Sequence, residues 1–353
     1  MHIKALNEHG AMICAIILQP FVTAVQEARC EAAEAVLREI VGTKNTRIGA
    51  APTIESQQAM LKVIMECMRA GRPIPFMVPW GSEKPDFTRS IDIAEVGAIK
   101  QMVCLNARIQ RFYEPGATFH LRLEDASAEH AFRRLGGFAC NATERYSSDL
   151  ELLLETFDAN RLHSIAESKF FPAQRFTEMA DGYTERFIRH FRLVDEGRIT
   201  DNDPDLVNIG WMGVVNNEMR QYYLARFARL YPQFSAAEHL QMVAEYFAGA
   251  LTRKQLMPMN DILGRHLVLS FVEPIPGAPK GMTETRTYMR TLPQNITSNH
   301  MPAWRAKGCV QIGPNGASMK LASWHEQRTY VRNQILVRSP RGFILPVDAD
   351  LIG

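Results

Sequence analysis

The sequence predicts an α/β fold in which helices flank a mixed, partly parallel sheet and a helical insertion or lid extends the body. The first observation is an alternation of helical and strand-like segments from residue 22 to residue 123. The second is a helix-rich middle section, after which the pattern returns to strands beyond Arg265. Such an alternation is typical of an α/β layer with parallel strands. The 353 residues are therefore interpreted as one Rossmann-like body rather than as two separate domains.

The first two elements are predicted to be helices. Apolar residues at three- and four-residue steps indicate a helix over Val22–Val41, which Gly42 ends. A second helix is expected to start after Thr53 as N-cap and to run to Ala70, with Gly71 as its stop.

A strand, a helix and a second strand follow. The apolar segment Pro73–Pro79 predicts a short buried strand, and the next helix is expected over Ile91–Tyr113. Glu114-Pro115-Gly116 predicts a turn into the strand Ala117–Leu123, whose residues alternate in polarity. One face of that strand carries Phe119, Leu121 and Leu123, and the other carries Thr118, His120 and Arg122.

The rest of the chain is predicted as helices and then strands. The helical segments are Ser148–Ala166, Glu178–Val194, Asn216–Leu230 and Ser235–Leu251, with a polar loop at Asp195–Pro204. The strands are Arg265–Phe271, Lys307–Gly313, Ser318–Trp324, Asn333–Ser339 and Gly342–Val347, with a loop rich in Pro and Gly at Glu273–Gly281. We therefore expect an α/β part over residues 1–142, a helical insertion or lid over 143–260, and strands over 261–353 that complete the sheet.

The composition indicates a folded, globular chain. Hydrophobic residues make up 46% of it, which suffices for a full core and excludes disorder. The 40 Lys and Arg residues nearly balance 38 Asp and Glu, for a net charge of +2. We therefore expect neither a nucleic-acid partner nor a membrane partner, since both favour a strongly basic surface.

The cysteines and the N-terminal stretch argue against a zinc protein, a disulfide scaffold and a membrane-spanning segment. The six cysteines are scattered without a C-x-x-C pair, which argues against a zinc site and against a disulfide scaffold. We expect no metal, and reduced thiols in a cytoplasmic protein. The apolar stretch Ala11–Val25 is interrupted by Gln19 and Pro20 and is shorter than the ~20 residues that cross a bilayer. It is expected to be a buried first element.

The common catalytic and phosphate-binding motifs are missing. The sequence contains no G-x-G-x-x-G, no G-x-x-x-x-G-K-[ST], no G-x-S-x-G and no H-E-x-x-H. Candidate functional residues must therefore come from polar groups at predicted strand ends.

Two such groups lie in the first half of the chain. Trp80, Ser82 and Lys84 follow a predicted buried strand, where open α/β sheets bind ligands, although the loop also fits an ordinary surface turn. Tyr113 precedes the next strand and Asp125 follows it. Asp125 either orients a substrate amine or hydroxyl by a charge-assisted hydrogen bond, or caps a helix over Ala126–Arg134.

A third group lies near the C-terminus and contains Ser298, His300, Lys307, Trp324 and His325. A histidine at a strand end can transfer protons or bind an anion, and it can equally be a partly buried structural residue. The tryptophans and tyrosines are expected mostly in the core. Several of them converging on one pocket would suit a cationic ligand.

These segments, in this order, resemble the pyoverdine/dityrosine-biosynthesis family, which includes the isonitrile synthases. The matching residues are Ile74-Pro75-Phe76 with Ser82 and Lys84, Asp92–Glu95, Tyr113–Gly116, Glu124–Ala126, Ser298–His300, Lys307 and Ala322–His325. The resemblance covers Ile74–Asp149 and Thr291–Glu326. It implies an enzyme of specialised metabolism, such as a nonribosomal peptide pathway, that acts on an amino acid. In the isonitrile synthases, a phosphosugar supplies the isonitrile carbon to the nitrogen of an amino acid.

Two departures from the family change the expected substrate. Gly81 and Ile296 stand where the family carries basic residues. Because a phosphate dianion is normally held by Arg or Lys, their loss argues against an unchanged phosphosugar site. The favoured interpretation is cyclisation of S-adenosylmethionine to azetidine-2-carboxylate with release of methylthioadenosine. This reaction uses no cofactor beyond S-adenosylmethionine as substrate.

The expected catalytic residues are Tyr113, Asp125 and His325, and the expected substrate-binding residues are Trp80, Ser82, Lys84, Ser298, His300 and Trp324. The expected partner is a small-molecule substrate, with association into a homodimer left open. Two alternatives remain: an isonitrile synthase that uses an aromatic amino acid and a pentulose phosphate, and a non-catalytic helical binding module.

Overall fold

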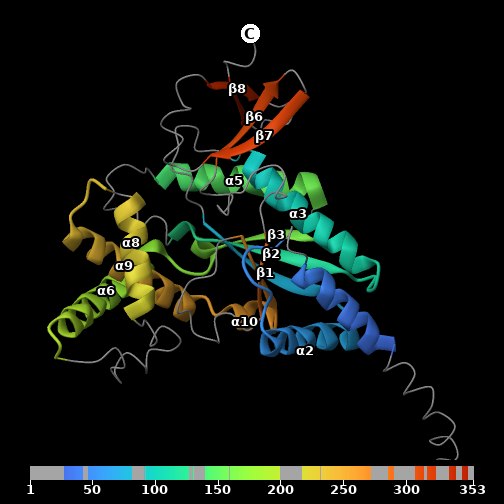
Figure 1. Ribbon diagram of the computed structural model, residues 1–353, viewed down its shortest axis with the longest axis horizontal. Coiled ribbons are helices and arrows are strands. Elements are labelled where there is room, and N and C mark those ends of the chain that lie inside the picture. Colours follow the sequence, from blue (N-terminus) through green and yellow to red (C-terminus); the bar gives the residue numbers. More distant parts are fainter. Residues whose placement is uncertain are drawn as a thin grey trace, which may run out of the picture.

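A parallel sheet of five strands lies at the centre of the chain, in the order β3-β2-β1-β4-β5 (Figure 1). Its strands are β1 (Ile74–Trp80), β2 (Ala117–Leu123), β3 (Leu162–Ala166), β4 (Leu267–Ser270) and β5 (Arg286–Tyr288). Every neighbouring pair is parallel. The predicted Rossmann-like α/β fold is confirmed.

The structure is a computed structural model. It describes residues 28–42, 47–81, 91, 93–126, 130, 140–158, 160–198, 217–230, 232–271, 285–289, 307–313, 316–322, 334–338 and 344–348. Among the helices described there, none is long and apolar enough to cross a membrane.

One face of the sheet packs against the helix of residues 28–41 and against α2 (Ile54–Ala70), α3 (Ile93–Gln110) and α5 (Cys140–Asp158). Phe119, Leu121 and Leu123 of β2 are wholly buried in this core, as the alternation predicts. The Phe119 ring stacks on the Phe76 ring of β1, with centroids 5.1 Å apart. Because side chains alternate between the two faces of a sheet, burying these residues on one face places the residues between them on the other face.

Helix α2 has the ends that the sequence predicts. The Thr53 side chain accepts a hydrogen bond from the Ser56 amide at 3.3 Å, which satisfies one of the free N–H groups of the first turn. Gly71 ends the helix in the left-handed conformation at φ 63°, where a residue without Cβ carries no steric cost.

The other face of the sheet packs against α6 (Ala173–Asp195), α9 (Ala236–Leu256) and α10 (Met259–Leu263). Met77 and Val268 of the sheet lie in one apolar cluster with Phe176 of α6 and Met259 of α10. Helix α8 (Asn217–Leu230) packs on α9, and α6, α8 and α9 share a second cluster rich in Phe and Tyr. We call α6, α8 and α9 the helical unit; it lies to the left of the sheet in Figure 1.

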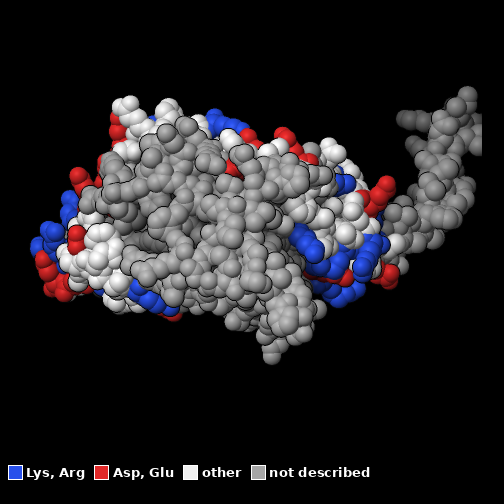
Figure 2. All heavy atoms as spheres, turned by 90° about the horizontal axis from the view of Figure 1, so that it is seen from above, with Lys and Arg blue, Asp and Glu red and all other residues white. Residues whose placement is uncertain are grey.

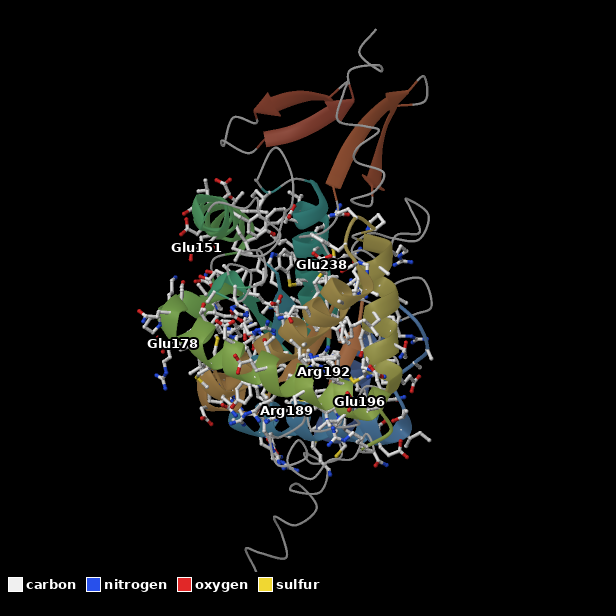
Figure 3. The ribbon with its side chains drawn as sticks, turned by 90° about the vertical axis from the view of Figure 1, so that its left-hand side faces the viewer. Glu151, Glu178, Arg189, Arg192, Glu196 and Glu238 are labelled. Atoms are coloured by element: carbon white, nitrogen blue, oxygen red, sulfur yellow. The ribbon has the colours of Figure 1, made fainter. Side chains whose placement is uncertain are left out.

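The outer side of the helical unit is charged. The exposed side chains of Glu178, Arg189, Arg192 and Glu196 lie along α6 and its C-terminal end (Figure 3). In the view of Figure 2, Lys and Arg of the described residues alternate with Asp and Glu around the rim. This mixed surface agrees with the near-neutral net charge.

The prediction of one helix over Ser148–Ala166 is wrong in its second half. Helix α5 ends at Asp158, and Leu162–Ala166 forms the edge strand β3, which pairs with β2 from Phe119↔Leu162 to Leu123↔Ala166. Five residues are too few for their periodicity to separate a strand from a helix, so pairing with β2 decides the structure. The three-residue strand β5 was not predicted at all.

Of the strands predicted beyond Arg265, β4 joins the parallel sheet, whereas the four strands that follow residue 306 exist where predicted but do not join it. β6 (Lys307–Gly313), β7 (Gly316–Ala322), β8 (Gln334–Arg338) and β9 (Ile344–Asp348) form a second sheet in the order β7-β6-β9-β8, at the top of Figure 1. β6 and β7 pair antiparallel up to Gly313↔Gly316, as do β8 and β9. Antiparallel neighbours need only a short connection, which lets these consecutive strands pair with each other.

Candidate functional site

The strand order marks one place in the parallel sheet as the favoured ligand-binding position. From β1 the chain moves outward to β2 and β3, and it later returns to place β4 and β5 on the other side of β1. The order therefore reverses between β1 and β4, and open α/β sheets bind ligands at the carboxyl ends of strands beside such a reversal. β1 ends at Trp80, and Phe271 follows the end of β4. Their rings meet edge to face at 6.3 Å.

A charged cluster lies at the carboxyl ends of β2 and β3, on the side of β1 away from the reversal and joined to the end of β1 by the hydrogen bond from the Glu124 amide to the Trp80 carbonyl. We call its members Arg122, Glu124, Glu167 and Arg253 the edge cluster. Arg122 Nη2 donates to Glu124 Oε1 at 3.0 Å, and Arg253 Nη1 donates to the same oxygen at 2.8 Å. Arg253 Nε lies 2.6 Å from Glu167 Oε1. Each guanidinium is thus paired with a carboxylate inside the cluster.

Burial explains why these charges need one another. The Glu167 side chain is 0% exposed, and that of Arg253 is 14% exposed. The pKa of Arg122 is lowered, first by burial and next by the charge of Arg253, while Glu124 and Glu167 oppose that shift. Removing ions from water is costly unless opposite charges and hydrogen bonds compensate. The cluster supplies the opposite charges, with carboxylates that follow two strands and an arginine from α9, although Arg122 Nε and Glu167 Oε1 are buried without a hydrogen bond among the described residues.

Asp125 directly follows Glu124 and is partly exposed. Its Oδ1 accepts a hydrogen bond from the Ser168 amide at 3.2 Å. Asp125 and Ala126 are both helical, so Asp125 is not the N-cap of a helix that begins at Ala126. Its carboxylate instead joins the end of β2 to the 3-10 turn Glu167–Lys169 that follows β3.

Trp80 lies at the predicted strand end, but its ring faces the core. The residue is wholly buried, and its Nε1 donates to Tyr146 Oη at 2.9 Å. Tyr146 in turn donates to Glu95 Oε1 at 3.0 Å, so β1, α5 and α3 are joined by a buried polar chain. Tyr146 was not predicted as part of such a network, because no short motif links it to Trp80.

Tyr113 lies at the opposite end of β2 from Asp125. Its hydroxyl donates to the carbonyl oxygens of Arg72 at 2.8 Å and Cys67 at 3.1 Å. Burial raises its pKa, with the Cys67 thiol contributing next. The seven-residue strand β2 lies between the two residues, which at ~3.3 Å per residue places them about 20 Å apart along the sheet. The structure therefore does not bring Tyr113 together with Asp125.

The other predicted site residues, Ser82, Lys84, Ser298, His300, Trp324 and His325, lie outside the described residues and stay predictions. Within the described ranges, no group of three or more His, Cys, Asp or Glu side chains is placed to hold a metal ion.

Three histidines, His120, His163 and His266, lie close together on the sheet, before the strand ends that carry the edge cluster. His120 of β2 and His163 of β3 are cross-strand neighbours, with ring centroids 5.1 Å apart. The pKa of His120 is lowered to about 4, first by burial and then by the nearby His163 and His266. At neutral pH, His120 is therefore uncharged and adds no positive charge to the site.

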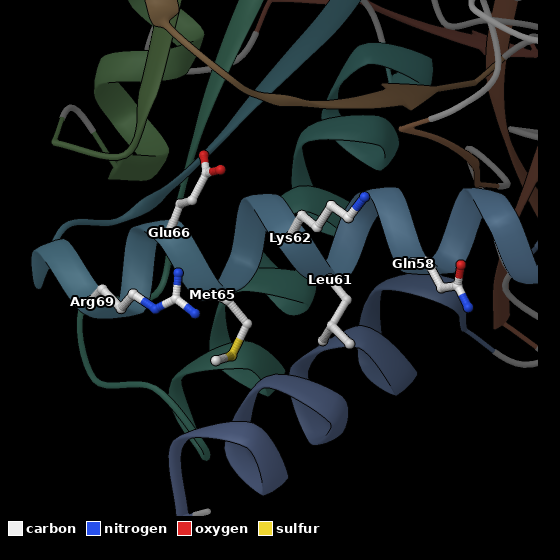
Figure 4. Close-up of a pocket in the computed structure, with 6 residues that line it drawn as sticks. All are labelled: Gln58, Leu61, Lys62, Met65, Glu66 and Arg69. Carbon is white, nitrogen blue, oxygen red and sulfur yellow. The ribbon is translucent and has the colours of Figure 1, made fainter. Parts of the chain in front are cut away.

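A shallow groove on the outer side of α2 lies away from this edge. It is lined by Gln58, Leu61, Lys62, Met65, Glu66 and Arg69, all from one helix (Figure 4). Leu61 and Met65 pack against the apolar core, and Glu66 pairs with Arg265, just before β4. No convergent set of polar groups from several elements faces this groove, so the edge cluster is the better candidate site.

The comparisons with known proteins support the fold. No protein-family model matches the chain, and no curated protein matches it by sequence. Among solved structures, the chain is similar to the PvcA protein from Pseudomonas aeruginosa, with a TM-score of 0.57 and 16% identity over 90% of this chain and 99% of that one. A cyclodipeptide synthetase from Mycobacterium tuberculosis matches at a TM-score of 0.32 and 12% identity, covering 70% and 96% of the two chains. The likeness to PvcA shows a shared fold, and the second likeness is too distant to add to it.

Proposed function

We propose that this protein is a specialised-metabolite biosynthetic enzyme, a diverged relative of the pyoverdine/dityrosine-biosynthesis family, that acts on an amino-acid-type substrate at the carboxyl edge of the parallel sheet. The favoured reaction is the cyclisation of S-adenosylmethionine to azetidine-2-carboxylate and methylthioadenosine. The order of the motifs along the sequence and the fold shared with PvcA support the family link.

The proposed substrate is chosen from the balance of charges at the carboxyl edge. Glu124, Glu167 and Asp125 supply carboxylates there, whereas Arg122 and Arg253 supply the guanidinium groups. Both arginines are paired within the edge cluster, and Asp125 makes no ion pair with a described residue. Such an edge attracts a cation. S-adenosylmethionine carries a sulfonium and an ammonium group against one carboxylate.

The reaction needs positioning and one proton acceptor. The substrate ammonium first loses a proton, and its nitrogen lone pair then forms a bond to the γ-carbon as the bond from that carbon to sulfur breaks. The electron pair of the broken bond leaves with sulfur, which becomes the neutral thioether of methylthioadenosine. In this proposal, Asp125 accepts the amine proton and keeps the nitrogen in line with the γ-carbon.

The isonitrile synthase alternative requires unpaired positive charge at the carboxyl edge. A phosphosugar brings a dianion, which needs Arg or Lys side chains that are not already neutralised. Among the described residues of this edge, the arginines are neutralised by Glu124 and Glu167. The charge balance therefore favours S-adenosylmethionine over a sugar phosphate.

Incubation of the purified protein with S-adenosylmethionine alone tests the proposal. Mass spectrometry is expected to detect azetidine-2-carboxylate and methylthioadenosine in equal amounts, above a heat-inactivated control. Parallel reactions contain an aromatic amino acid with and without a pentulose phosphate. An isonitrile product that requires the sugar, with no cyclisation of S-adenosylmethionine, would show that the proposed reaction is wrong.

A further inference from the structure

Arg253 connects two strand ends that no other described residue bridges in the same way. It lies in the last turn of α9, 129 residues from Glu124 in the sequence. Its Nη1 binds Glu124 after β2 at 2.8 Å, and its Nε lies 2.6 Å from Glu167 after β3. One planar guanidinium therefore holds two carboxylates from neighbouring strands, a geometry that the point charge of lysine does not reproduce.

The residues next to these two carboxylates make the contact that orients Asp125. Asp125 follows Glu124, Ser168 follows Glu167, and Asp125 Oδ1 accepts the Ser168 amide hydrogen at 3.2 Å. The Glu124 amide in turn donates to the Trp80 carbonyl at 3.0 Å, which joins this segment to the end of β1. Fixing Glu124 and Glu167 thus also fixes the distance between the Asp125 carboxylate and the Ser168 amide.

The helix that carries Arg253 is well anchored. Ser235 and Glu238 form a capping box at its start, and Phe247 and Leu251 are buried against α6 and α8. The position of Arg253 in the last turn is favourable, since a cation there interacts well with the helix dipole. Arg253 is thus held by its helix on one side and by two carboxylates on the other.

We propose that Arg253 is a positioning residue, which orients Asp125 for the reaction by bridging Glu124 and Glu167 across the ends of β2 and β3. This inference rests on the proposed function, because it assigns Asp125 the contact with the substrate amine. Arg253 itself touches neither the substrate nor the reacting atoms.

The variant Arg253→Lys tests the bridge while it keeps the positive charge, and Arg220→Lys is its matched control. Arg220 of α8 is also a buried arginine of the helical unit, with its Nη2 2.8 Å from Asp195 Oδ1 and a side chain that is 7% exposed. Asp195 ends α6 and has no part in the edge cluster. Both variants replace a buried arginine of the helical unit, but only Arg253→Lys loosens the carboxyl edge.

Each variant is characterised by steady-state kinetics and by hydrogen exchange at Ser168. We expect Arg253→Lys to lower kcat for S-adenosylmethionine by ~10- to 100-fold with KM changed less than about three-fold, since small misplacements of a catalytic group carry such costs. We expect hydrogen exchange at the Ser168 amide to become at least ~10-fold faster. Arg220→Lys is expected to keep kcat and the exchange rate at Ser168 near wild type, even where it lowers the Tm.

The outcomes separate this inference from the proposed function. Wild-type exchange at Ser168 and wild-type kcat in Arg253→Lys would overturn the positioning role. Equal losses of kcat in both variants would also overturn it, because they would indicate general destabilisation. If the wild-type protein leaves S-adenosylmethionine unchanged while Arg253→Lys still speeds exchange at Ser168 alone, the proposed reaction fails and the orientation of Asp125 by Arg253 stands. Glu167→Gln, which removes one side of the bridge, gives the same readouts if Arg253→Lys does not fold.

Discussion

Asp125 and Glu124 are neighbours in the sequence with different roles. Glu124 accepts hydrogen bonds from Arg122 and Arg253, and its charge is used inside the edge cluster. Among the described residues, Asp125 accepts a hydrogen bond only from the Ser168 backbone amide, so its charge is available to a bound cation. A carboxylate that must exchange a proton with substrate needs this freedom, because an arginine partner would hold it ionised.

At this scale, we expect Asp125→Asn to lower kcat for S-adenosylmethionine by ~100- to 10,000-fold, the usual contribution of a general base. The amide still accepts the Ser168 hydrogen bond, so the Tm is expected to stay close to wild type. Asp261→Asn, at an exposed position of α10, is the control and should keep full activity. Full activity of Asp125→Asn would rule out its role as proton acceptor.

Tyr146 is the middle member of the buried chain from Trp80 to Glu95. Tyr146→Phe removes the donor to Glu95 and the acceptor for Trp80, and we expect a loss of about 1–3 kcal/mol in the free energy of unfolding. Tyr113→Phe should cost less, because the Tyr113 hydroxyl is less buried and, among the described residues, contacts two backbone carbonyls. Urea unfolding of the two variants measures the difference, and equal losses would contradict this account.

At the scale of elements, local signals and long-range pairing explain different parts of the fold. The ends of α2 were predictable because Thr53 and Gly71 act within one turn of the helix. β3 was misread as helix because its five residues become a strand only through pairing with β2. The candidate site divides in the same way: Asp125 stands out beside a strand end, whereas Arg253 acquires its role only when α9 reaches the sheet.

The histidines on the sheet give a prediction about pH. Because the pKa of His120 falls to about 4 in the folded chain, the unfolded chain binds a proton below its ordinary pKa of 6.5 that the folded chain does not. Stability should therefore rise with pH between about 4 and 6.5 and be lost as the pH falls through that window. His266, whose pKa is lowered by burial, adds to the same slope.

The free energy of unfolding, measured across this pH range, is expected to rise less steeply with pH for His120→Gln than for wild type. The difference in slope should correspond to the uptake of up to about one proton on unfolding. His239→Gln, on α9 and away from the sheet, is the control. An unchanged slope in His120→Gln would show that other groups cause the pH dependence.

At the scale of the whole molecule, the helical unit and the sheet meet at the carboxyl edge. The edge cluster joins β2 and the turn after β3 to α9, and α6 packs on the same face of the sheet. A ligand that binds at this junction therefore contacts groups held by both parts and should stabilise the chain as a whole.

We expect saturating S-adenosylmethionine to raise the Tm by several degrees, since a ligand at about 100 times its Kd contributes ~2.7 kcal/mol. S-adenosylhomocysteine, which lacks the sulfonium charge, should raise the Tm less, and a pentulose phosphate should leave it unchanged. A thermal-shift series with these compounds compares them directly. A rise with the pentulose phosphate and none with S-adenosylmethionine would reverse the choice of substrate.

The position of β1 at the centre of the sheet affects the order in which the chain is synthesised and folded. β1 pairs on one side with β2, which is made soon afterwards, and on the other side with β4, whose residues come only after the helical unit is complete. A ribosome-bound chain that stops before Leu267 therefore exposes one edge of a strand whose residues are almost all apolar. Unpaired edges of this kind invite aggregation, and the pairing of β4 with β1 removes this exposed edge.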